Sequence, residues 1–407
     1  DTVEISGTPD AGTAGTYNID VTVTDSSSPT QSDNATLQLV VNSGGGTILK
    51  ADFEAIPTEG TAPLTVNFTD KSTGNPTSWE WDFDNDGTVD STDQNPQWTY
   101  NDPGWYTVKL TVSDGTNSNT CVKEKFIQVA TNVYYVDGVN GDDTNSGTDW
   151  SDAFATIGKA LSVAGDYDLV LVADATYNET DLNFNGKKIY LKGVDHNNAG
   201  AQPVIDCGGS GRAFYFGSGE TKDSIVENFT IRNGSAGYGG AIYCTSSSPT
   251  VSNCTFSGNS ADYGGAIYCS SSSPTLTNCT FSNNSANERG GAIRCITSSS
   301  PTMVNCTFSG NTAGDEGGAI CCYDSSSPTI TNCTFSGNSA DYGGAIYCYS
   351  SNPALNNCIL WSNTASTSGN EIYIADSGSS CTLNYCCVDN TGYGGQTGNI
   401  TENNCIY

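Results

Sequence analysis

The sequence predicts an all-β protein whose C-terminal part is a parallel β-helix, a coil of short strands in which each turn, or rung, stacks on the one before. The first observation is self-similarity: Gly-Gly-Ala-Ile recurs at residues 239, 264, 290, 317 and 343, at intervals of 25, 26, 27 and 26 residues. A fixed period of this size is typical of stacked repeats. The second is that short β-prone runs alternate with Gly-, Ser-, Asn- and Pro-rich turns. The leucine spacing of a leucine-rich repeat is absent, so we expect three-sided rungs of about 26 residues.

Stacking turns each column of equivalent residues into a ladder whose members lie about 4.8 Å apart. Two apolar columns are predicted to fill the interior: Ile242, Ile267, Ile293, Ile320 and Ile346, and Phe256, Phe281, Phe308 and Phe335. Two cysteine columns accompany them: Cys244, Cys269, Cys295, Cys322 and Cys348, and Cys254, Cys279, Cys306, Cys333 and Cys358. Both buried free thiols and disulfides between rungs fit this pattern. The rung spacing suits a disulfide, but the pleat of a strand points stacked side chains in parallel.

An asparagine column marks one turn of each rung: Asn253, Asn278, Asn305, Asn332 and Asn357. Stacked side-chain amides can hydrogen-bond along the axis and satisfy a tight turn. Four of these residues also begin an Asn-x-Thr glycosylation sequence. Glycans on every rung would collide at a spacing of about 4.8 Å, so a structural role is expected.

Three columns around the Gly-Gly pair are predicted to lie on the outside. One is acidic: Asp262, Glu288, Asp315 and Asp341. Like charges stacked in one column repel each other. The acidic column therefore predicts either a line of cation ligands or an ordinary turn exposed to solvent. Two are tyrosine columns with interruptions: Tyr238, Tyr263, Arg289, Glu316 and Tyr342, and Tyr243, Tyr268, Arg294, Cys321 and Tyr347. Exposed tyrosines in rows would either stack on sugar rings or shield the sheet.

The N-terminal segment, residues 1–44, alternates like β-strands at Tyr17-Asn-Ile-Asp-Val-Thr-Val and Ala35-Thr-Leu-Gln-Leu-Val-Val. With Ile5-Ser-Gly-Thr-Pro, it resembles the end of a cadherin-like or immunoglobulin-like repeat. Half a sandwich has an open strand edge, which predicts either further strands upstream or self-assembly with a neighbouring molecule. Residues 45–50 are expected to be a flexible linker.

Residues 51–130 resemble a polycystic-kidney-disease (PKD) repeat. The motifs are Ala62-Pro-Leu-Thr-Val-Asn-Phe-Thr-Asp, Trp79-Glu-Trp-Asp-Phe-Asp-Asn-Asp-Gly and Tyr106-Thr-Val-Lys-Leu-Thr-Val-Ser-Asp. The resemblance implies a β-sandwich that serves as a spacer or adhesion module beside catalytic or binding modules of extracellular proteins.

Within this segment, residues 82–93 have the spacing of a twelve-residue calcium loop, with Gly87 at its sixth position. The candidate ligands are Asp82, Asp84, Asp86, Asp90 and Asp93. Calcium binds six to eight hard oxygens, which alternate carboxylates can supply. The last ligand is Asp instead of Glu and no helices are expected beside the loop, so an ordinary hairpin turn is the alternative.

Residues 131–232 are expected to form the first part of the β-helix, and residues 233–407 its regular rungs and C-terminal end. Phe154, Ile157, Leu161 and Ala164 recur at helical spacing, which predicts a short helix that caps the open apolar end of the coil. Leu169–Ala173 is expected to be a buried strand.

The repeated Gly-Gly-Ala-Ile and Phe-x-x-Asn motifs resemble those of chlamydial polymorphic outer-membrane proteins and, more loosely, the pectate-lyase-like β-helices. This resemblance implies a right-handed coil and a secreted or cell-surface protein for adhesion, carbohydrate binding or assembly, including an extracellular filament. It also raises the alternative of a polysaccharide lyase or glycoside hydrolase. The residues that break the repeat are then the catalytic candidates: Glu288, Arg289, Arg294, Asp315 and Glu316. The near-uniform rungs and the lack of a long insertion favour binding over catalysis.

Composition limits the possible partners. Lys and Arg total 14 against 44 Asp and Glu, so the formal net charge is −30. Nucleic acids and anionic membranes are therefore excluded as partners, because both require clustered cations. No apolar run is long enough to span a membrane. Polysaccharides or cell-surface glycans, with calcium as a cofactor, remain the expected partners.

Overall fold

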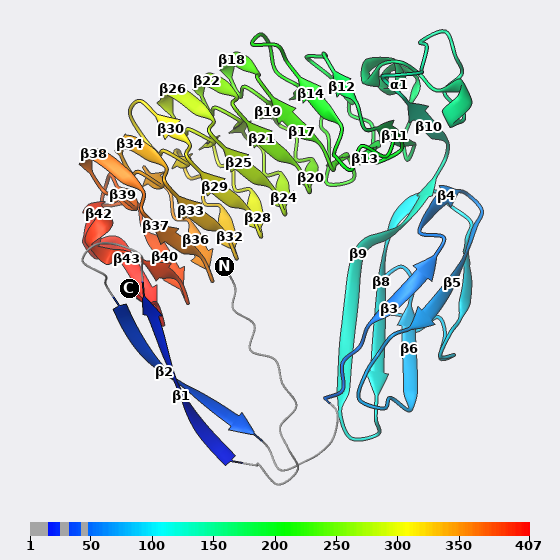
Figure 1. The fold of residues 1–407 in the computed structure, drawn as a ribbon, viewed down its shortest axis with the longest axis horizontal. Helices are drawn as coiled ribbons and strands as arrows, with labels where there is room; N and C mark the ends of the chain where they lie inside the picture. The colour runs from blue at the N-terminus through cyan, green and yellow to red at the C-terminus, as the bar shows by residue number, and fades with distance from the viewer. Residues whose placement is uncertain (1–14, 25–31, 42–47) are drawn as a thin grey trace. The chain divides into compact units, whose positions relative to one another are not determined.

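The computed structural model describes residues 15–24, 32–41 and 48–407, with side chains from residue 48 onward (Figure 1). The chain folds as two compact units. Residues 127–407 all belong to the larger unit, and they contain the parallel β-helix. Among the described residues, the structure has no helix with the length and apolar character needed to cross a membrane.

Three long parallel sheets form the sides of the β-helix. The first sheet has eleven strands: β10 (Val133–Val136), β11 (Leu169–Ala173), β13 (Tyr190–Val194), β16 (Ile225–Glu227), β20 (Thr250–Ser252), β24 (Thr275–Thr277), β28 (Thr302–Val304), β32 (Thr329–Thr331), β36 (Ala354–Asn356), β40 (Cys381–Asn384) and β43 (Ile400–Asn403). The second has nine: β12 (Thr176–Tyr177), β14 (Val204–Asp206), β17 (Thr230–Arg232), β21 (Thr255–Ser257), β25 (Thr280–Ser282), β29 (Thr307–Ser309), β33 (Thr334–Ser336), β37 (Ile359–Trp361) and β41 (Cys387–Val388). The third has eight: β15 (Phe214–Phe216), β19 (Ile242–Thr245), β23 (Ile267–Ser270), β27 (Ile293–Ile296), β31 (Ile320–Cys322), β35 (Ile346–Cys348), β39 (Ile372–Ile374) and β42 (Tyr393–Gly395).

A fourth sheet of six short strands is added to the three sides that the sequence predicts. Its strands are β18 (Ser235–Tyr238), β22 (Ser260–Tyr263), β26 (Ser285–Arg289), β30 (Thr312–Ala313), β34 (Ser339–Tyr342) and β38 (Thr364–Ser368). In each rung this strand lies between the second and third sheets, just before the Gly-Gly pair. Gly264 has φ +65°, and a Cβ on Gly265 would lie 2.2 Å from the carbonyl oxygen of Gly291 in the next rung. The pair therefore makes a corner that only glycine fits.

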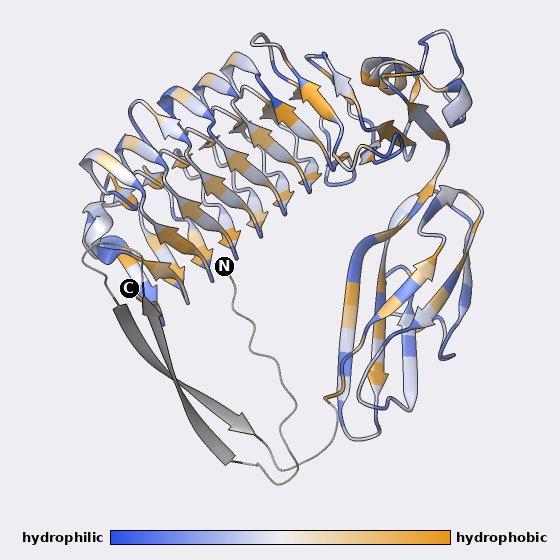
Figure 2. Ribbon diagram, in the orientation of Figure 1, coloured by the Kyte–Doolittle hydropathy of each residue, from blue (hydrophilic) through white to orange (hydrophobic). Residues whose placement is uncertain are grey.

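The interior contains the predicted ladders, and apolar residues mark the strands of the coil in Figure 2. Successive rings from Phe256 to Phe335 stack with centroids 4.8, 4.8 and 4.6 Å apart. All residues of the isoleucine and phenylalanine columns are buried. The cysteine columns hold buried free thiols, and the structure does not show the disulfide alternative. Cys279 Sγ instead lies 3.4 Å from the carbonyl oxygen of Thr277, which is a weak hydrogen bond that caps the turn.

The predicted asparagine column is confirmed as a turn. Asn278, Asn305 and Asn332 have positive φ between 53° and 55°, a conformation that asparagine tolerates better than most residues. Their side-chain amides donate to the asparagine of the preceding rung at 3.1, 3.1 and 3.2 Å.

The capping helix is also confirmed. Helix α1 (Ile157–Val163) begins at Thr156, whose hydroxyl accepts a hydrogen bond from the Lys159 amide. A short 3₁₀ segment, η1 (Trp150–Asp152), precedes it, and η2 (Asn390–Gly392) and η3 (Thr397–Asn399) lie near the C-terminal end. The four residues of the predicted apolar face are buried: Phe154, Ile157, Leu161 and Ala164.

The segment predicted to be a PKD sandwich forms two sheets. One contains β3 (Phe53–Ile56), β5 (Leu64–Asp70) and β7 (Gln97–Tyr100); the other contains β4 (Glu59–Thr61), β9 (Ser118–Ala130), β8 (Gly104–Ser113) and β6 (Ser78–Asp82). Phe53, Phe68 and Trp81 pack together as its aromatic core. Further upstream, β1 (Gly15–Thr24) and β2 (Ser32–Val41) pair as antiparallel strands, as the alternation predicts. The rest of the predicted half-sandwich lies outside the described residues.

A second asparagine ladder, inside the β-helix, was not predicted. It consists of Asn259, Asn284, Asn311, Asn338 and Asn363, all buried. Each side-chain amide donates to the side-chain oxygen of the next, at 2.8 to 3.0 Å. All the amides therefore point the same way along the axis. The last one donates to the buried carboxylate of Glu371, at 2.5 Å.

Glu371 should make stability depend on pH. Burial raises the pKa of Glu371 to about 6, and the hydrogen bonds from Asn363 oppose this only in part. Because the folded-state pKa lies above the value of about 4.3 for an exposed glutamate, the folded protein binds more protons between these values. This contribution is therefore fully present below about pH 4 and is lost as the pH rises through about 6.

We expect wild type to lose about 2 kcal/mol more than Glu371→Gln between pH 4.5 and pH 7, at about 1.4 kcal/mol per pKa unit. Denaturant unfolding of the two proteins at both pH values measures this difference. The contributions of all other carboxylates are common to both proteins and cancel in the comparison. Equal losses would contradict a raised pKa at Glu371.

Candidate functional site

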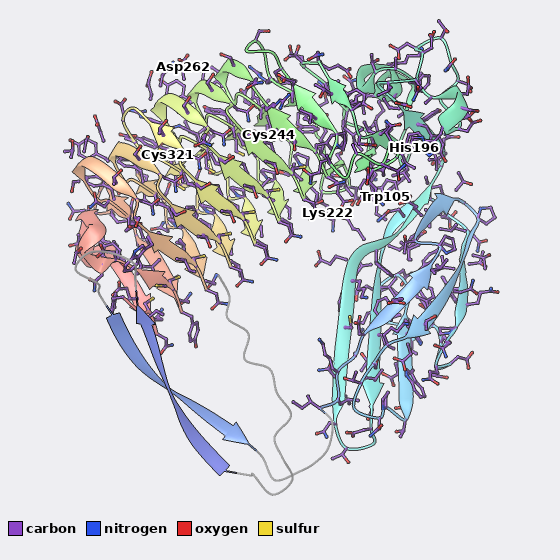
Figure 3. The ribbon with its side chains drawn as sticks, viewed as in Figure 1. Trp105, His196, Lys222, Cys244, Asp262 and Cys321 are labelled. Carbon is purple, nitrogen blue, oxygen red and sulfur yellow. The ribbon has the colours of Figure 1, made fainter. Side chains whose placement is uncertain are left out.

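The predicted tyrosine columns lie side by side on the outside of the third sheet, where we call them the tyrosine face. One column faces outward from the third sheet itself: Tyr215, Tyr243, Tyr268, Arg294, Cys321, Tyr347 and Tyr373. The other lies at the end of the fourth-sheet strands or, for Glu316, three residues beyond: Tyr238, Tyr263, Arg289, Glu316 and Tyr342. Figure 3 labels Cys321 on the first column and Asp262 on the neighbouring strand β22.

The prediction that all six tyrosines are exposed is wrong for two of them. Tyr268 and Tyr347 are buried, with 8% and 6% of their surface exposed. They do point away from the interior, but the fourth-sheet column covers them; the ring of Tyr238 meets that of Tyr268 edge-on at 5.0 Å. Tyr243, Tyr263 and Tyr342 are half-buried. Tyr238 is 46% exposed and stacks on Tyr263, with centroids 5.6 Å apart.

Two further tyrosines, which the repeat pattern did not predict, belong to this face. Tyr323 and Tyr349 stand at positions where earlier rungs have Thr245, Ser270 and Ile296. Their rings stack at 4.7 Å, and Tyr349 is 40% exposed. They break the repeat, and this departure from the serine and threonine pattern was the signal that could have found them.

Charged residues replace tyrosines at the centre of the face. Arg294 is 3% exposed, and its guanidinium lies 4.4 Å from the ring of Tyr323 and 2.9 Å from Cys321 Sγ. Arg289 Nε lies 2.8 Å from Glu316 Oε2, although the approach is not aligned for a hydrogen bond. A guanidinium against an aromatic ring is attracted by the ring's quadrupole, so the cations replace tyrosine without losing contact with the remaining rings.

Burial keeps the tyrosine hydroxyls and the cysteine thiol at the centre of the face in their neutral form. It raises the pKa of Tyr268 and of Cys321 to about 12, although Arg294 opposes the shift at both. Burial and the nearby Glu316 carboxylate raise the pKa of Tyr347 well above its usual range. The hydroxyls therefore stay protonated at neutral pH and can donate hydrogen bonds. Tyr263 donates one to Glu288 Oε2, at 2.5 Å.

The predicted acidic column keeps its register at Glu288, Asp315 and Asp341 but is interrupted between Asp262 and Glu288. The pairing between β22 and β26 shifts by one residue after Ala261, so Asp262 meets Asn287, whose amide donates to it at 2.7 Å. The extra residue lies between Ala286 and Arg289. The Asp315 amide donates to the Glu288 carbonyl at 2.7 Å, so these two residues lie side by side in neighbouring rungs, as predicted. The column therefore runs over Glu288, Asp315 and Asp341 in adjacent rungs, and Asp262 does not join it.

The five catalytic candidates lie together, but most of them have protein partners. Arg289 and Glu316 pair with each other, Arg294 is buried, and Glu288 accepts from Tyr263. Asp315 is exposed. A hydrolase needs two carboxylates free to act as acid and base or nucleophile, whereas these side chains hold the face together and present its polar centre.

The structure brings together three of the five predicted calcium ligands. Oxygen atoms of Asp82, Asp84 and Asp86 lie within 4.8 Å of one another. Asp90 instead accepts from the Phe83 amide at 2.7 Å, and Asp93 is not part of the group. Burial, together with repulsion from the neighbouring aspartates, raises the pKa of Asp84. This is the response of a carboxylate whose surroundings are too negative, which a cation would relieve.

The comparisons agree with this architecture. A model described as a right-handed β-helix region matches residues 174–316 and 277–406, together more than half of the chain. The chain belongs to the right-handed β-helix family. A PKD-domain model matches residues 48–129 of this β-helix protein, which confirms the predicted PKD repeat. PKD and β-helix domains are typical of modular extracellular proteins.

Several solved structures are similar to this β-helix protein. They include the pectate lyase Pel9A, at 15% identity over 68% of this chain and 79% of that one, with a TM-score of 0.35. The GH136 lacto-N-biosidase from Eubacterium ramulus is 11% identical over 68% of this chain and 65% of that one, with a TM-score of 0.34. A rhamnogalacturonan lyase is 14% identical over 63% and 74%, with a TM-score of 0.28. A search of curated protein sequences gives no significant match.

Proposed function

We propose that this protein is an extracellular glycan-binding module and that the tyrosine face is its binding surface. The observation that carries the proposal is the exposed ring of Tyr238, held in place by parallel stacking on Tyr263. The C–H faces of sugar rings are apolar, and a tyrosine covers them while its hydroxyl stays in water. Few rotatable bonds make such rings inexpensive to immobilise on binding.

The polar centre of the face supplies what a sugar needs besides stacking. Arg289 remains about a third exposed and offers guanidinium donors, while Glu288 and the tyrosine hydroxyls offer acceptors and donors. Tyr349, 40% exposed, provides a second ring on the far side of this centre. The chain's net charge of −30 repels anionic polymers, so the expected ligand is a neutral glycan.

Replacing Tyr238 by alanine should weaken glycan binding about fivefold, because one aromatic stacking contact contributes about 1 kcal/mol. A glycan array with the full chain identifies the ligand, and calorimetry then compares wild type with Tyr238→Ala. Tyr385→Ala is the matched control, since Tyr385 is 64% exposed but lies outside the tyrosine face.

Equal losses in the two variants would refute the tyrosine face as the binding surface, and so would failure of every neutral glycan to bind. Release of shortened products from a bound polysaccharide, abolished in Glu288→Gln, would replace binding with catalysis as the function.

We also propose that the aspartates of the PKD repeat bind calcium. Asp82, Asp84 and Asp86 would supply hard oxygen ligands of the kind calcium prefers. Lys109 Nζ lies 3.3 Å from Asp82 Oδ2 and would have to share that carboxylate. The role expected of the ion is to neutralise the loop and stiffen it.

Calcium should raise the unfolding temperature of the PKD repeat. At a hundredfold excess over Kd the stabilisation is about 2.7 kcal/mol, and each kcal/mol corresponds to about 4–8 °C in a domain of this size. Asp84→Asn should abolish the calcium shift but unfold no lower than wild type without calcium, because it removes a repelled charge. Calorimetry tests this, with Asp114→Asn as the control; an unshifted wild type would reject the site.

A further inference from the structure

The outward side of the second sheet carries a regular array of small hydroxyl residues, which we call the threonine–serine face. It comprises Thr255, Ser257, Thr280, Ser282, Thr307, Ser309, Thr334 and Ser336, on β21, β25, β29 and β33 (Figure 1). The strands pair with threonine beside threonine and serine beside serine. Within a strand the two rows are about 6.6 Å apart, since residues rise about 3.3 Å each.

This array is flat as well as regular. The phenylalanines on the inner side of the same four strands stack with ring planes inclined by only 5°, 3° and 1°, and with centroids 4.6–4.8 Å apart. Neighbouring strands usually twist by about 20°, which would turn the rows of side chains away from one plane. Successive rungs here are related by translation with very little rotation, so the outer rows form a lattice.

The hydroxyl groups of this face are available to an outside partner. Within the described part of the chain, none of the eight side chains makes a hydrogen bond to protein. Serines elsewhere in the same rungs behave differently: Ser272 and Ser299, for example, accept from backbone amides of the preceding rung at 3.1 and 3.0 Å. The free hydroxyls are therefore a property of this face and not of the rungs in general.

The face is also neutral, in a chain with a net charge of −30. None of the outward residues on its four strands is charged. On the next side of the coil, the first-sheet strands β20, β24, β28 and β32 of the same rungs also carry only threonine, serine and valine on the outside. On the second sheet, the threonine–serine face ends at Arg232 on β17 and at Trp361 on β37. Of the acidic residues in these rungs, Asp262, Glu288, Asp315, Glu316 and Asp341 lie in or beside the fourth sheet, and Asp324 lies in the turn after β31.

A neutral, flat lattice of hydroxyl and methyl groups has a restricted set of partners. Ions and phosphates need charged ligands, and sugar rings are usually held by aromatic side chains; the face has neither. Ice presents rows of oxygen atoms with a repeat of similar size to the rung spacing. Threonine is stiff at χ1, so its methyl and hydroxyl groups would hold adjacent water in an ordered pattern at a low entropic cost. We infer that the threonine–serine face binds ice.

The test measures thermal hysteresis and retention on ice with the full chain. Wild type is expected to show both, and Thr307→Tyr, which places a bulky ring in the middle of the lattice, is expected to lose them. Thr364→Tyr is the matched control, because Thr364 is an exposed strand threonine of the fourth sheet, and it should retain both. Circular dichroism checks that the variants fold.

Absence of hysteresis in wild type would overturn the inference, as would unchanged activity in Thr307→Tyr. In either case the threonines would be explained by their preference for strands. Binding to insoluble cellulose or chitin instead of ice, lost in Thr307→Tyr, would also overturn it. These results are independent of the glycan-binding proposal, which is tested with Tyr238.

Discussion

Replacing Phe308 by alanine is expected to destabilise the β-helix by about 3–5 kcal/mol, the usual cost of removing a buried aromatic side chain. Phe308 is fully buried and stacks on Phe281 and Phe335, at 4.8 and 4.6 Å. The rung spacing is fixed by backbone hydrogen bonds on either side of the ring, so the neighbouring rungs cannot close the cavity. One substitution therefore affects three rungs.

Denaturant unfolding followed by circular dichroism measures this loss, and native-state hydrogen exchange places it within the stack. Arrays of repeats do not always unfold in one step, so exchange of amides in β25, β29 and β33 is the more direct measurement. Thr307→Ala is the matched control on the same strand; it points outward and should change stability by no more than about 0.5 kcal/mol. A cost for Phe308→Ala no larger than the control's would contradict a rigid interior.

Replacing Asn311 by alanine is the second change with a large expected effect. The side-chain oxygen of Asn311 accepts from the backbone and the side chain of Asn284, at 3.1 and 2.9 Å. Its amide donates to Asn338 Oδ1 and to the carbonyl of Phe281, at 2.8 and 3.0 Å. Truncation leaves the Asn284 backbone amide without its buried partner and removes a partner of the Asn284 side chain and of the Phe281 carbonyl, at about 1–3 kcal/mol each, and water can recover part of this. Asn338 Oδ1 keeps the Asn311 backbone amide as a donor, at 3.0 Å. We expect a loss of about 3–5 kcal/mol.

Asn305→Gly is the control for this prediction. Asn305 belongs to the exposed ladder in the same rung, and glycine keeps its positive φ of 55° without strain. Water can replace its side-chain hydrogen bonds, so the expected loss is about 1 kcal/mol. Unfolding free energies of the two variants under one set of conditions decide the matter. Losses of equal size would show that burial of the inner ladder is not what makes it stabilising.

The repeat made the fold predictable from the sequence, because periodicity and strand alternation depend only on local chemistry. The Gly-Gly corners, the phenylalanine and isoleucine ladders and the asparagine turns all follow from it. Alternation gave the side of the sheet on which Tyr268 and Tyr347 lie, but it could not give what covers that side. The fourth sheet does so, and its strands contain no Val, Ile, Leu or Phe that would mark them as strands in the sequence.

The sequence predicted where the candidate site lies on the β-helix, but it did not predict the contacts of its side chains. Interruption of the repeat pointed to Arg289, Arg294 and Glu316, which do lie together. An extra residue in the third repeat interrupts the acidic column after Asp262, because a β-bulge leaves one residue of a strand without a partner. The pairing resumes at Tyr263 and Arg289. The inner asparagine ladder was visible as a recurrent Phe-x-x-Asn, but a polar residue gives no sequence signal of burial unless its partners are known.

The inner asparagine ladder has a consequence for how such a protein can change in length. Each amide makes the same contacts as the one before it, and only Glu371 ends the series. Duplicating or deleting one complete repeat in the gene would therefore leave every inner hydrogen bond with an equivalent partner. A change of any other size would break the series at one point. Unequal recombination between such similar repeats gives this protein a ready route to longer and shorter forms that still fold.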